Sequence, residues 1–428
     1  MKTIAIIGGG PAGATAAERL ASGGGGTSAA GSRVLVFEQR LGWEKPCGGG
    51  LPPRALRRYP FLAEARDAHT AVRDAEFVAG NGASVQLRLR EPLAIYSRAV
   101  LNGLLLRRAE RAGAEIVQDR IVSFERADGR DGSPFHGGPQ GGNVRHSRGR
   151  PPVGPTGWRL KGREGSYAAD YLILAAGARS RLRGLVADHF PARDFMLTFG
   201  YYSAAAPGRD TLLRVQFFED FEGYAWSFPR PDHLSLGICG KVGEGTMPEL
   251  RQRLHGFANR FGYAYEGAPV FSHLLPALTT ASWGDLRLAG DGWALAGDAA
   301  GLVDPVTGEG IYFAMRSGEL LAEALLAGVP ATYPERVWRD FGRRLALGSR
   351  LARLFYHDDF LGAPSTTRLV QFAARSRSFM ELLDDLIDGS QSYAGLAGRL
   401  YRSLGAALVE RAAPFARSAP RRELTTEN

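Results

Sequence analysis

Cysteines and long apolar runs are both scarce in this chain of 428 residues. Only two cysteines occur, Cys47 and Cys239, so a framework of disulfide bonds is excluded and a reducing compartment is expected. No apolar run reaches the roughly 18 residues that a membrane-spanning helix needs, so no such helix is predicted. The first residues lead directly into an apolar strand and carry no cleavable secretion signal. We therefore expect a cytoplasmic protein.

Lysine is also rare, so arginine carries nearly all of the positive charge behind the net charge of +9. The arginines are scattered and accompany no nucleic-acid-binding motif, so no nucleic-acid partner is expected. A general preference for arginine explains this composition most simply. The alternative is peripheral contact with an anionic membrane, at the inner face, through arginines near the C-terminus. These are Arg399, Arg402, Arg411, Arg417, Arg421 and Arg422.

A glycine-rich turn lies near the start of the chain. An apolar strand precedes Gly8, Gly10 and Gly13, and a helical pattern follows them. The first glycine permits the tight turn, the second lets a pyrophosphate approach the backbone, and the third lets helix and strand pack closely. A second apolar strand, residues 34–37, ends at Glu38, whose carboxylate can bind a ribose with a free 2′-hydroxyl. The pattern predicts a site for FAD or NAD rather than NADP.

A second glycine-rich segment, residues 297–313, favours FAD over NAD. Asp298 follows an apolar strand and can hold the ribityl chain of a flavin, whereas Gly308 and Gly310 precede a helical pattern. The N-terminus of that helix can face the flavin pyrimidine, which gathers negative charge on reduction. Glu309 is expected to cap the helix or to point to solvent rather than to act in catalysis.

Apolar runs that alternate with helical patterns predict an α/β protein with a parallel sheet. Residues 128–157 are rich in Gly and Pro and indicate an exposed insertion loop. Residues 195–240 alternate apolar and polar positions, as antiparallel strands do. We expect a Rossmann-like FAD/NAD(P)-binding domain over residues 1–75, 94–186 and 284–330, a discontinuous antiparallel-sheet substrate domain over residues 76–93 and 187–283, and a helical C-terminal region over residues 331–428.

These segments resemble the glutathione-reductase-type FAD fold, and more closely the group that contains aromatic hydroxylases and geranylgeranyl reductases. Residues 45–51, Lys-Pro-Cys-Gly-Gly-Gly-Leu, resemble the loop that the geranylgeranyl reductase family places beside the flavin. Residues 223–229 resemble that family's Tyr-x-Trp-x-Phe-Pro motif. Arg98 resembles the arginine that the group places near the FAD phosphates. Residues 175–183 resemble the group's Asp-Gly motif, with Ala176 in place of the aspartate.

The resemblance implies a cofactor site at both glycine-rich turns and the loop between them. Its candidate residues are Gly8, Gly10, Ala12, Gly13, Glu38, Cys47, Gly48, Gly50, Arg98, Val122, Gly297, Asp298, Gly308, Gly310 and Ile311. No metal site is predicted.

The catalytic candidates are Cys47 and Tyr224. Cys47 either lies against the flavin, where it shapes or protonates the substrate site, or is a small buried hydrophobe. Tyr224 and Trp226 are two residues apart in a strand and therefore share one face, which either lines an apolar substrate tunnel or belongs to the core. Phe228 and Pro229 complete the candidate substrate site.

The resemblance implies an FAD-dependent oxidoreductase that saturates C=C bonds of an isoprenoid, such as a prenyl lipid, a quinone tail or a chlorophyll side chain. Hydride comes from reduced FAD, and the site supplies a proton. No second GxGxxG unit is present, so NAD(P)H must dock transiently or a reduced ferredoxin must supply electrons. The sequence does not predict the oligomeric state.

Two alternatives remain open. One is an FAD-dependent monooxygenase, either an aromatic hydroxylase or a halogenase. Tyr-Ala-Trp-Ser-Phe-Pro at residues 224–229 departs from the Trp-x-Trp-x-Ile-Pro motif of halogenases, which weighs against halogenation. The other is a non-catalytic flavin-binding or membrane-surface module.

Overall fold

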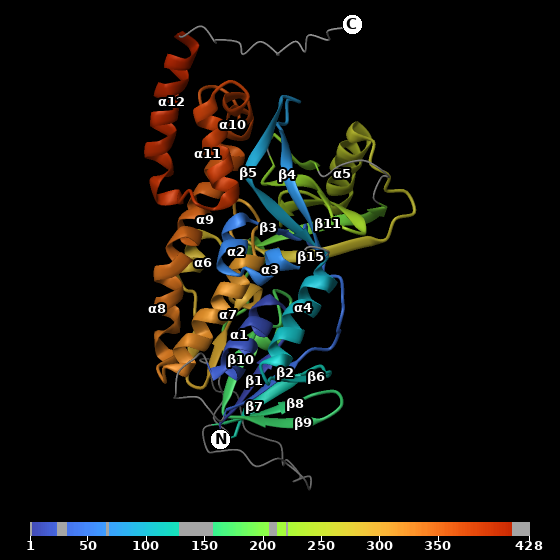
Figure 1. Ribbon diagram of the computed structural model, residues 1–428, viewed down its shortest axis with the longest axis vertical. Helices are drawn as coiled ribbons and strands as arrows, with labels where there is room; N and C mark the ends of the chain where they lie inside the picture. The colour runs from blue at the N-terminus through green and yellow to red at the C-terminus, as the bar shows by residue number, and fades with distance from the viewer. Residues whose placement is uncertain are drawn as a thin grey trace, which may run out of the picture.

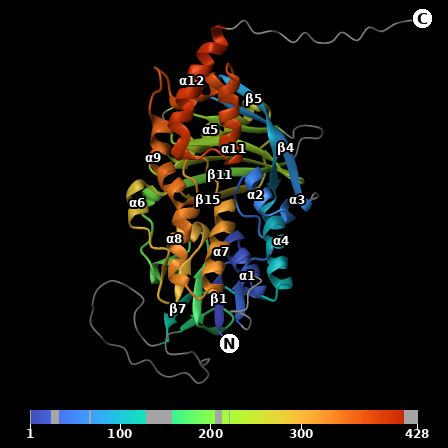
Figure 2. The ribbon, with the colours of Figure 1, turned by 60° about the vertical axis from the view of Figure 1, so that its left-hand side comes forward.

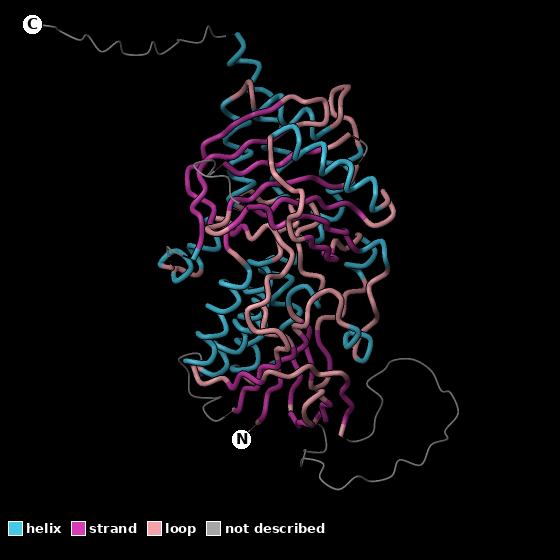
Figure 3. Tube along the Cα trace, turned by 90° about the vertical axis from the view of Figure 1, so that its right-hand side faces the viewer, coloured by secondary structure: helices cyan, strands magenta, loops and turns pink. Residues whose placement is uncertain are grey.

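The computed structural model describes residues 2–23, 32–65, 68–127, 157–204, 212–219 and 221–412. The molecule is elongated (Figure 1), with one sheet near the N-terminus and a larger sheet beside the last helices at the opposite end. Strands gather in two separate layers, with helices between and beside them (Figure 3). Of the insertion loop predicted over residues 128–157, all but Gly157 lies outside the described residues.

Five parallel strands with one antiparallel edge strand form the first sheet, in the order β16-β17-β10-β1-β2-β6. These strands are β1 (Thr3–Ile7), β2 (Arg33–Phe37), β6 (Glu115–Val117), β10 (Tyr171–Leu174), β16 (Ala289–Gly290) and β17 (Trp293–Leu295). Their central members are apolar and buried, as expected of strands covered on both faces. A three-stranded antiparallel sheet packs against them, made of β7 (Ser123–Arg126), β8 (Trp158–Lys161) and β9 (Ser166–Ala169). The rings of Phe37 and Tyr167 meet there, with centroids 4.6 Å apart.

Helices α1 (Pro11–Ala21), α4 (Arg98–Arg111) and α7 (Ile311–Leu326) pack beside one another on the first sheet (Figure 1). The short helices α2 (Pro53–Arg58) and α3 (Phe61–Glu64) lie next to them. Gly318 allows α7 to approach α1 closely, because a Cβ at this position would lie 2.2 Å from the carbonyl oxygen of Ala12.

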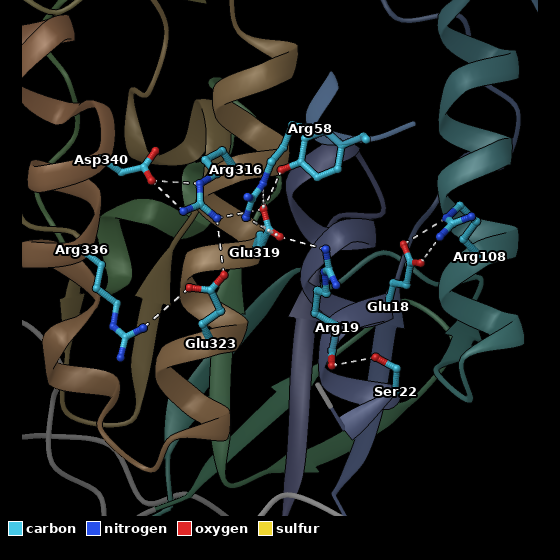
Figure 4. A network of polar contacts seen from close by, with 11 residues as sticks. Glu18, Arg19, Ser22, Arg58, Arg108, Arg316, Glu319, Glu323, Arg336 and Asp340 are labelled. Atoms are coloured by element: carbon cyan, nitrogen blue, oxygen red, sulfur yellow. Dashed lines mark hydrogen bonds and ion pairs between the residues drawn. The ribbon is translucent and has the colours of Figure 1, made fainter. Parts of the chain in front are cut away.

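A buried carboxylate joins these helices (Figure 4). Glu319 of α7 is 3% exposed and accepts hydrogen bonds from Arg19, Arg58, Arg316 and the hydroxyl of Tyr59. Burial opposes ionisation of Glu319, but the charge of Arg316 and its hydrogen bond outweigh burial and lower the pKa. The helix layer is therefore held by charge as well as by apolar packing.

The larger sheet has eight strands in the order β15-β11-β14-β13-β12-β4-β5-β3. They are β3 (Gly50–Leu51), β4 (His69–Val78), β5 (Ser84–Tyr96), β11 (Phe195–Ala204), β12 (Leu212–Phe217), β13 (Gly223–Pro229), β14 (His233–Lys241) and β15 (Val270–Pro276). The strands of residues 195–240 pair antiparallel as expected, but β12 pairs parallel with β4. Such a pair needs a long crossover, and here the connection passes through the first sheet. The sequence pattern of either strand alone does not reveal its partner.

Two of the predicted domain boundaries lie inside strands of the larger sheet. Those at residues 75/76 and 93/94 fall inside β4 and β5, which are hydrogen-bonded to each other from His69 to Tyr96. The whole hairpin thus belongs to the larger sheet, because the ladder continues beyond the alternating segment that the sequence marks. Helix α5 (Met247–Phe261) covers one face of this sheet through Leu250, Leu254 and Phe257.

The C-terminal helices are α8 (Tyr333–Val337), the π-helical turn η7 (Trp338–Gly342), α9 (Arg343–His357), α10 (Ser365–Ala373), α11 (Arg377–Asp388), the short turn η8 (Tyr393–Gly395) and α12 (Leu396–Ala412). They run from the first sheet, where α8 packs against α7, to the larger sheet, which α9, α10, α11 and α12 lie beside (Figure 2). None of the helices in the described part of the chain is long and apolar enough to span a membrane. Arg399, one of the arginines considered for lipid contact, pairs with Asp385 at 2.5 Å. Arg417, Arg421 and Arg422 lie outside the described residues, as does the side chain of Arg411.

The fold class is thus a Rossmann-like α/β domain with a second sheet and a helical C-terminal region, which confirms the prediction.

Candidate functional site

One cavity of about 1190 Å³ begins at the glycine turn after β1 and continues between the larger sheet and the C-terminal helices. Of the predicted cofactor residues, all except Gly13 line it. Tyr224, Trp226 and Phe228 line it too, whereas Pro229 does not. Residues that are distant in the sequence therefore meet around a single space.

The glycine turn is shaped for a ligand at one position and for the fold at the other two. A Cβ on Gly8 would lie 2.4 Å from the carbonyl oxygen of Ala175, and one on Gly13 would lie 2.0 Å from that of Gly8. No atom of the described part of the chain lies within 4 Å of a Cβ built on Gly10, which borders the cavity. Gly10 thus leaves room for a pyrophosphate. Gly13 serves helix–strand packing, which agrees with its absence from the cavity lining.

Glu38 stands where the second strand ends, at the rim of the cavity. Its carboxylate accepts hydrogen bonds from the backbone N–H groups of Gly9 and Arg40, both at 2.9 Å. These bonds hold the carboxylate beside the glycine turn. Remaining lone pairs can accept ribose hydroxyls.

Arg98 lies at the start of α4, where it is 3% exposed and its Nε has no hydrogen-bond partner among the described residues. The Glu44 carboxylate accepts hydrogen bonds from the backbone N–H groups of Arg98 and Ala99, both at 2.8 Å, and so caps this helix. A buried guanidinium with an unpartnered N–H group at a cavity wall suits a phosphate. Val122, half-exposed after β6, lines the cavity at the same end.

Asp298 lies in the turn η5 (Gly297–Ala300) and pairs with Lys45, with Nζ 2.6 Å from Oδ2. Burial disfavours its charge, but Lys45 outweighs burial and lowers the pKa of Asp298. His273 of β15 borders the same space, and burial followed by the charge of Lys45 lowers its pKa to about 3. Nothing in the sequence marked Lys45 as the partner of Asp298 or His273 as a neighbour, because the three come from distant segments.

The start of α7 lies beside Asp298. Gly308 has a positive φ of 70°, and a Cβ there would lie 2.7 Å from the hydroxyl oxygen of Tyr224. Gly310 is the N-cap of α7, and Ile311 is the first helical residue. The free N–H groups of this helix end therefore border the cavity, as an electron-rich ring requires.

Glu309 does not point to solvent, contrary to expectation. Its side chain is 15% exposed and pairs with Arg54 of α2. Burial raises the pKa of Glu309, although Arg54 opposes this shift. The sequence offered no hint of the partner, which lies 255 residues away.

The loop with Cys47 packs against the strand β13. A Cβ on Gly48 would lie 2.5 Å from the ring of Phe228, and one on Gly50 would lie 3.2 Å from it. Gly49 has a φ of 84° and faces the carbonyl of Tyr96. Within the described part of the chain, Gly48 and Gly50 therefore approach the ring of Phe228. Cys47 itself is half-buried at the cavity wall, and its Sγ accepts a hydrogen bond from Gly49 N–H at 3.3 Å.

Alternate residues of β13 face the cavity, as the strand period requires. The rings of Tyr224 and Trp226 lie 6.0 Å apart. The Tyr224 hydroxyl donates to the carbonyl of Thr307 at 2.6 Å, which ties β13 to the loop before α7. Burial raises the pKa of Tyr224 well above its usual value.

Sequence reasoning missed the far wall of the cavity, which is built from apolar side chains of the larger sheet and the C-terminal helices. These are Ala75, Phe77, Leu93, Leu213, Val215, Phe217, Leu351, Phe355, Leu369, Leu383, Leu386, Ile387 and Leu396. Helical spacing of apolar residues marks a buried face but does not distinguish a cavity wall from a packed core.

The residues present fit FAD. Gly10 leaves an open approach, Arg98 has an unpartnered N–H group, and Asp298 with the α7 N-terminus lies farther along the same space. This arrangement offers groups in turn for an adenosine, a pyrophosphate and a flavin.

Comparisons with known proteins agree with this geometry. Residues 2–197 match the family described as pyridine nucleotide-disulphide oxidoreductase. The chain is 29% identical to the chloroplastic geranylgeranyl diphosphate reductase of Oryza sativa over 76% of its own length and 66% of that relative's length. It is 28% identical to a menaquinone reductase of Mycobacterium tuberculosis over 96% of its own length and 98% of that relative's.

A solved structure shares the fold. The geranylgeranyl bacteriochlorophyll reductase-like protein of Thermoplasma acidophilum superposes with a TM-score of 0.70, at 19% identity, over 94% of this chain and 99% of that one. The resemblance predicted from the sequence is confirmed: residues 2–197 match an FAD-binding oxidoreductase family, and the chain is similar to geranylgeranyl diphosphate reductases.

Proposed function

We propose that the protein saturates C=C bonds of an isoprenoid chain. The observation that carries this proposal is the continuity of the cavity, which runs from the dinucleotide turn to an apolar compartment under the C-terminal helices. A long hydrocarbon chain gains about 0.8 kcal/mol for each CH₂ group that it buries in such a space. A polar or small aromatic substrate would leave most of that wall unused.

The names of the relatives support the same substrate class. One is a reductase of geranylgeranyl diphosphate and the other of menaquinone, which carries a prenyl tail. We propose an isoprenoid of this kind as the substrate of this chain. The electron donor is proposed to be NAD(P)H or a reduced ferredoxin, because either could reach the cavity without a second dinucleotide domain.

The cofactor and the protein chain make different contributions to the reaction. When bound and reduced by the electron donor, FAD would supply the hydride. The chain must bind the alkene near the loop of residues 45–51, exclude water, and supply one proton. Apolar side chains exclude water at the far end, whereas Lys45, Asp298 and the α7 N-terminus hold polar groups at the near end.

Cys47 is the better proton donor of the two candidates. Tyr224 already donates its hydroxyl hydrogen to Thr307, and burial raises the pKa of Tyr224. Cys47 borders the cavity with a half-buried thiol. We therefore propose that Cys47 protonates the alkene and that Tyr224 fixes the loop before α7.

An anaerobic single-turnover experiment tests the function. The holoenzyme is reduced with dithionite and mixed with geranylgeranyl diphosphate or a menaquinone, and the absorbance of the flavin and the mass of the lipid are followed. Reoxidation of the flavin with a gain of two hydrogens by the lipid is expected. A monooxygenase would instead consume NAD(P)H rapidly with oxygen and an aromatic substrate, and would leave the prenyl chain unchanged.

Replacing Cys47 tests its role. Cys47→Ala should keep FAD bound but lower the rate of alkene reduction about a hundredfold, because general acids contribute that order of rate enhancement. FAD absorbance and single-turnover rates measure the two effects. Full turnover by this variant would rule out both a proton-donor and a positioning role for the thiol.

A further inference from the structure

Arg230 follows the last residue of β13 and is buried behind the loop that carries Cys47. Its side chain is fully buried, and its guanidinium donates to the Glu44 carboxylate and to the Cys47 carbonyl. A Cβ on Gly49 would lie 3.3 Å from its Nε. Arg230 does not line the cavity, so it touches the loop from the side away from the substrate space.

The second partner of Arg230 connects this contact to the FAD end of the site. Glu44 accepts hydrogen bonds from the Ser97 hydroxyl at 2.6 Å and from the first backbone N–H groups of α4. Burial opposes the charge of Glu44, but the charge of Arg230 together with the hydrogen bonds from Ser97, Ala99 and Arg98 lowers the pKa of the carboxyl. One guanidinium therefore joins β13, the Cys47 loop and the capped end of α4.

The loop needs such an anchor because its own sequence provides little rigidity. Three glycines follow Cys47, and glycine has the greatest conformational freedom of all residues. The Cys47 carbonyl accepts from Arg230 and from the Ser235 hydroxyl, the latter at 3.0 Å. Since this carbonyl and the thiol belong to one residue, fixing the carbonyl restricts where the thiol can lie.

We propose that Arg230 is a positioning residue that holds the Cys47 carbonyl and thereby fixes the thiol at the cavity wall. Its importance for catalysis rests on the proposed function, whereas its effect on the thiol does not. Hydrogen bonds to charged groups are stronger than neutral ones, so Arg230 is the main anchor and Ser235 the weaker one.

The variants must separate anchoring from general stability. Arg230→Met alone leaves the partly buried Glu44 carboxylate without its positively charged partner, which destabilises the fold. The double variant Glu44→Gln/Arg230→Met removes both charges together. Arg230→Lys keeps a charge for Glu44 but cannot donate a planar pair of hydrogen bonds.

A matched control is available in the same sheet. Arg214 of β12 pairs with Glu76 of β4 at 2.6 Å, and both side chains are largely buried. Glu76→Gln/Arg214→Met makes the same chemical change away from the Cys47 loop. Any effect shared by the two double variants reflects stability rather than anchoring.

The accessibility of the Cys47 thiol can be measured by its rate of alkylation with iodoacetamide in the holoenzyme. The alkylated fraction is followed by mass spectrometry at a series of pH values. Cys239, the other cysteine, is 1% exposed, and burial raises its pKa to about 12, so it serves as an unreactive internal reference. The limiting rate at high pH reports access to the thiolate, and the midpoint reports its pKa.

Loss of the Arg230 hydrogen bond should raise the limiting alkylation rate about tenfold in Glu44→Gln/Arg230→Met. The free energy of one hydrogen bond to a charged group corresponds to about a tenfold change in an equilibrium constant. Arg230→Lys should give a smaller increase, Ser235→Ala the smallest, and the Arg214 control none. Unchanged alkylation in a folded Glu44→Gln/Arg230→Met protein, or an equal change in the control, would overturn the proposal. Altered alkylation in an enzyme that reduces no alkene would instead refute the proposed function and leave the positioning role standing.

Discussion

At the dinucleotide end of the cavity the wall is formed largely by backbone groups and charged side chains, whereas at the far end it is formed by apolar side chains. Gly10 leaves open space, Asp298 presents a carboxylate, and Gly310 lies at the helix end that presents N–H groups. Phe217, Phe355 and Leu386 present only hydrocarbon. The first end can recognise one cofactor through fixed positions, but the second can accept any chain that fits. The difference suggests that cofactor and substrate choice are separate properties of this molecule.

The largest expected effect concerns the charge network beneath the dinucleotide end. Glu319→Gln should lower the free energy of unfolding by about 3 kcal/mol at neutral pH, because it breaks a buried ion pair. The pKa of Glu319 is lowered in the folded state, so its stabilisation is present above its ordinary pKa of 4.5. The stabilisation should be lost as pH falls below that value.

Denaturant unfolding of Glu319→Gln and of the parent protein at several pH values measures the difference in free energy of unfolding. Glu323→Gln, on the same helix but 41% exposed, serves as the control and should cost less than about 1 kcal/mol. A Glu319 effect that stayed the same across the acidic range would contradict the ionic account of this layer.

Gly10→Glu should weaken FAD binding about a hundredfold, because a carboxylate would face the pyrophosphate across the open approach. Stability should hardly change, since nothing lies within 4 Å of a Cβ at this position. Titration of the apoprotein with FAD measures the affinity. Gly256→Glu in α5, where a Cβ also meets nothing, is the matched control. Equal FAD affinity in Gly10→Glu and the parent would place the pyrophosphate elsewhere.

Phe355→Ala should raise the KM for a prenyl substrate about tenfold, because it removes apolar contact area from the far wall. FAD affinity should remain unchanged. Phe372→Ala is a fitting control, since Phe372 packs in the same apolar cluster but does not line the cavity. If Phe355→Ala weakened FAD binding instead, the two ends of the cavity would not be independent.

The glycine turn and the strands and helix around it can be predicted from the sequence, because backbone requirements leave recognisable residues. Gly8 and Gly13 have no room for a Cβ, and Glu38 must end its strand. These constraints are local, so they can be read from one segment at a time. The parallel sheet and the helical C-terminal region follow from local periodicity in the same way.

The remainder depends on contacts between distant segments. Lys45 and Asp298 are 253 residues apart, and Glu44 and Arg230 are 186 residues apart. Neither pair has a local signature. The parallel pairing of β4 with β12 and the apolar cavity wall are hidden for the same reason, since leucines at helical spacing look alike in a core and in a cavity.

The most direct test of the account is the dependence of turnover on chain length. Leu386→Trp narrows the far end and should lower the ratio of kcat/KM for geranylgeranyl diphosphate to that for geranyl diphosphate about tenfold. The shorter chain should still be reduced as fast as by the parent enzyme, because it need not reach α11. An unchanged ratio would contradict the claim that the apolar compartment holds the substrate chain.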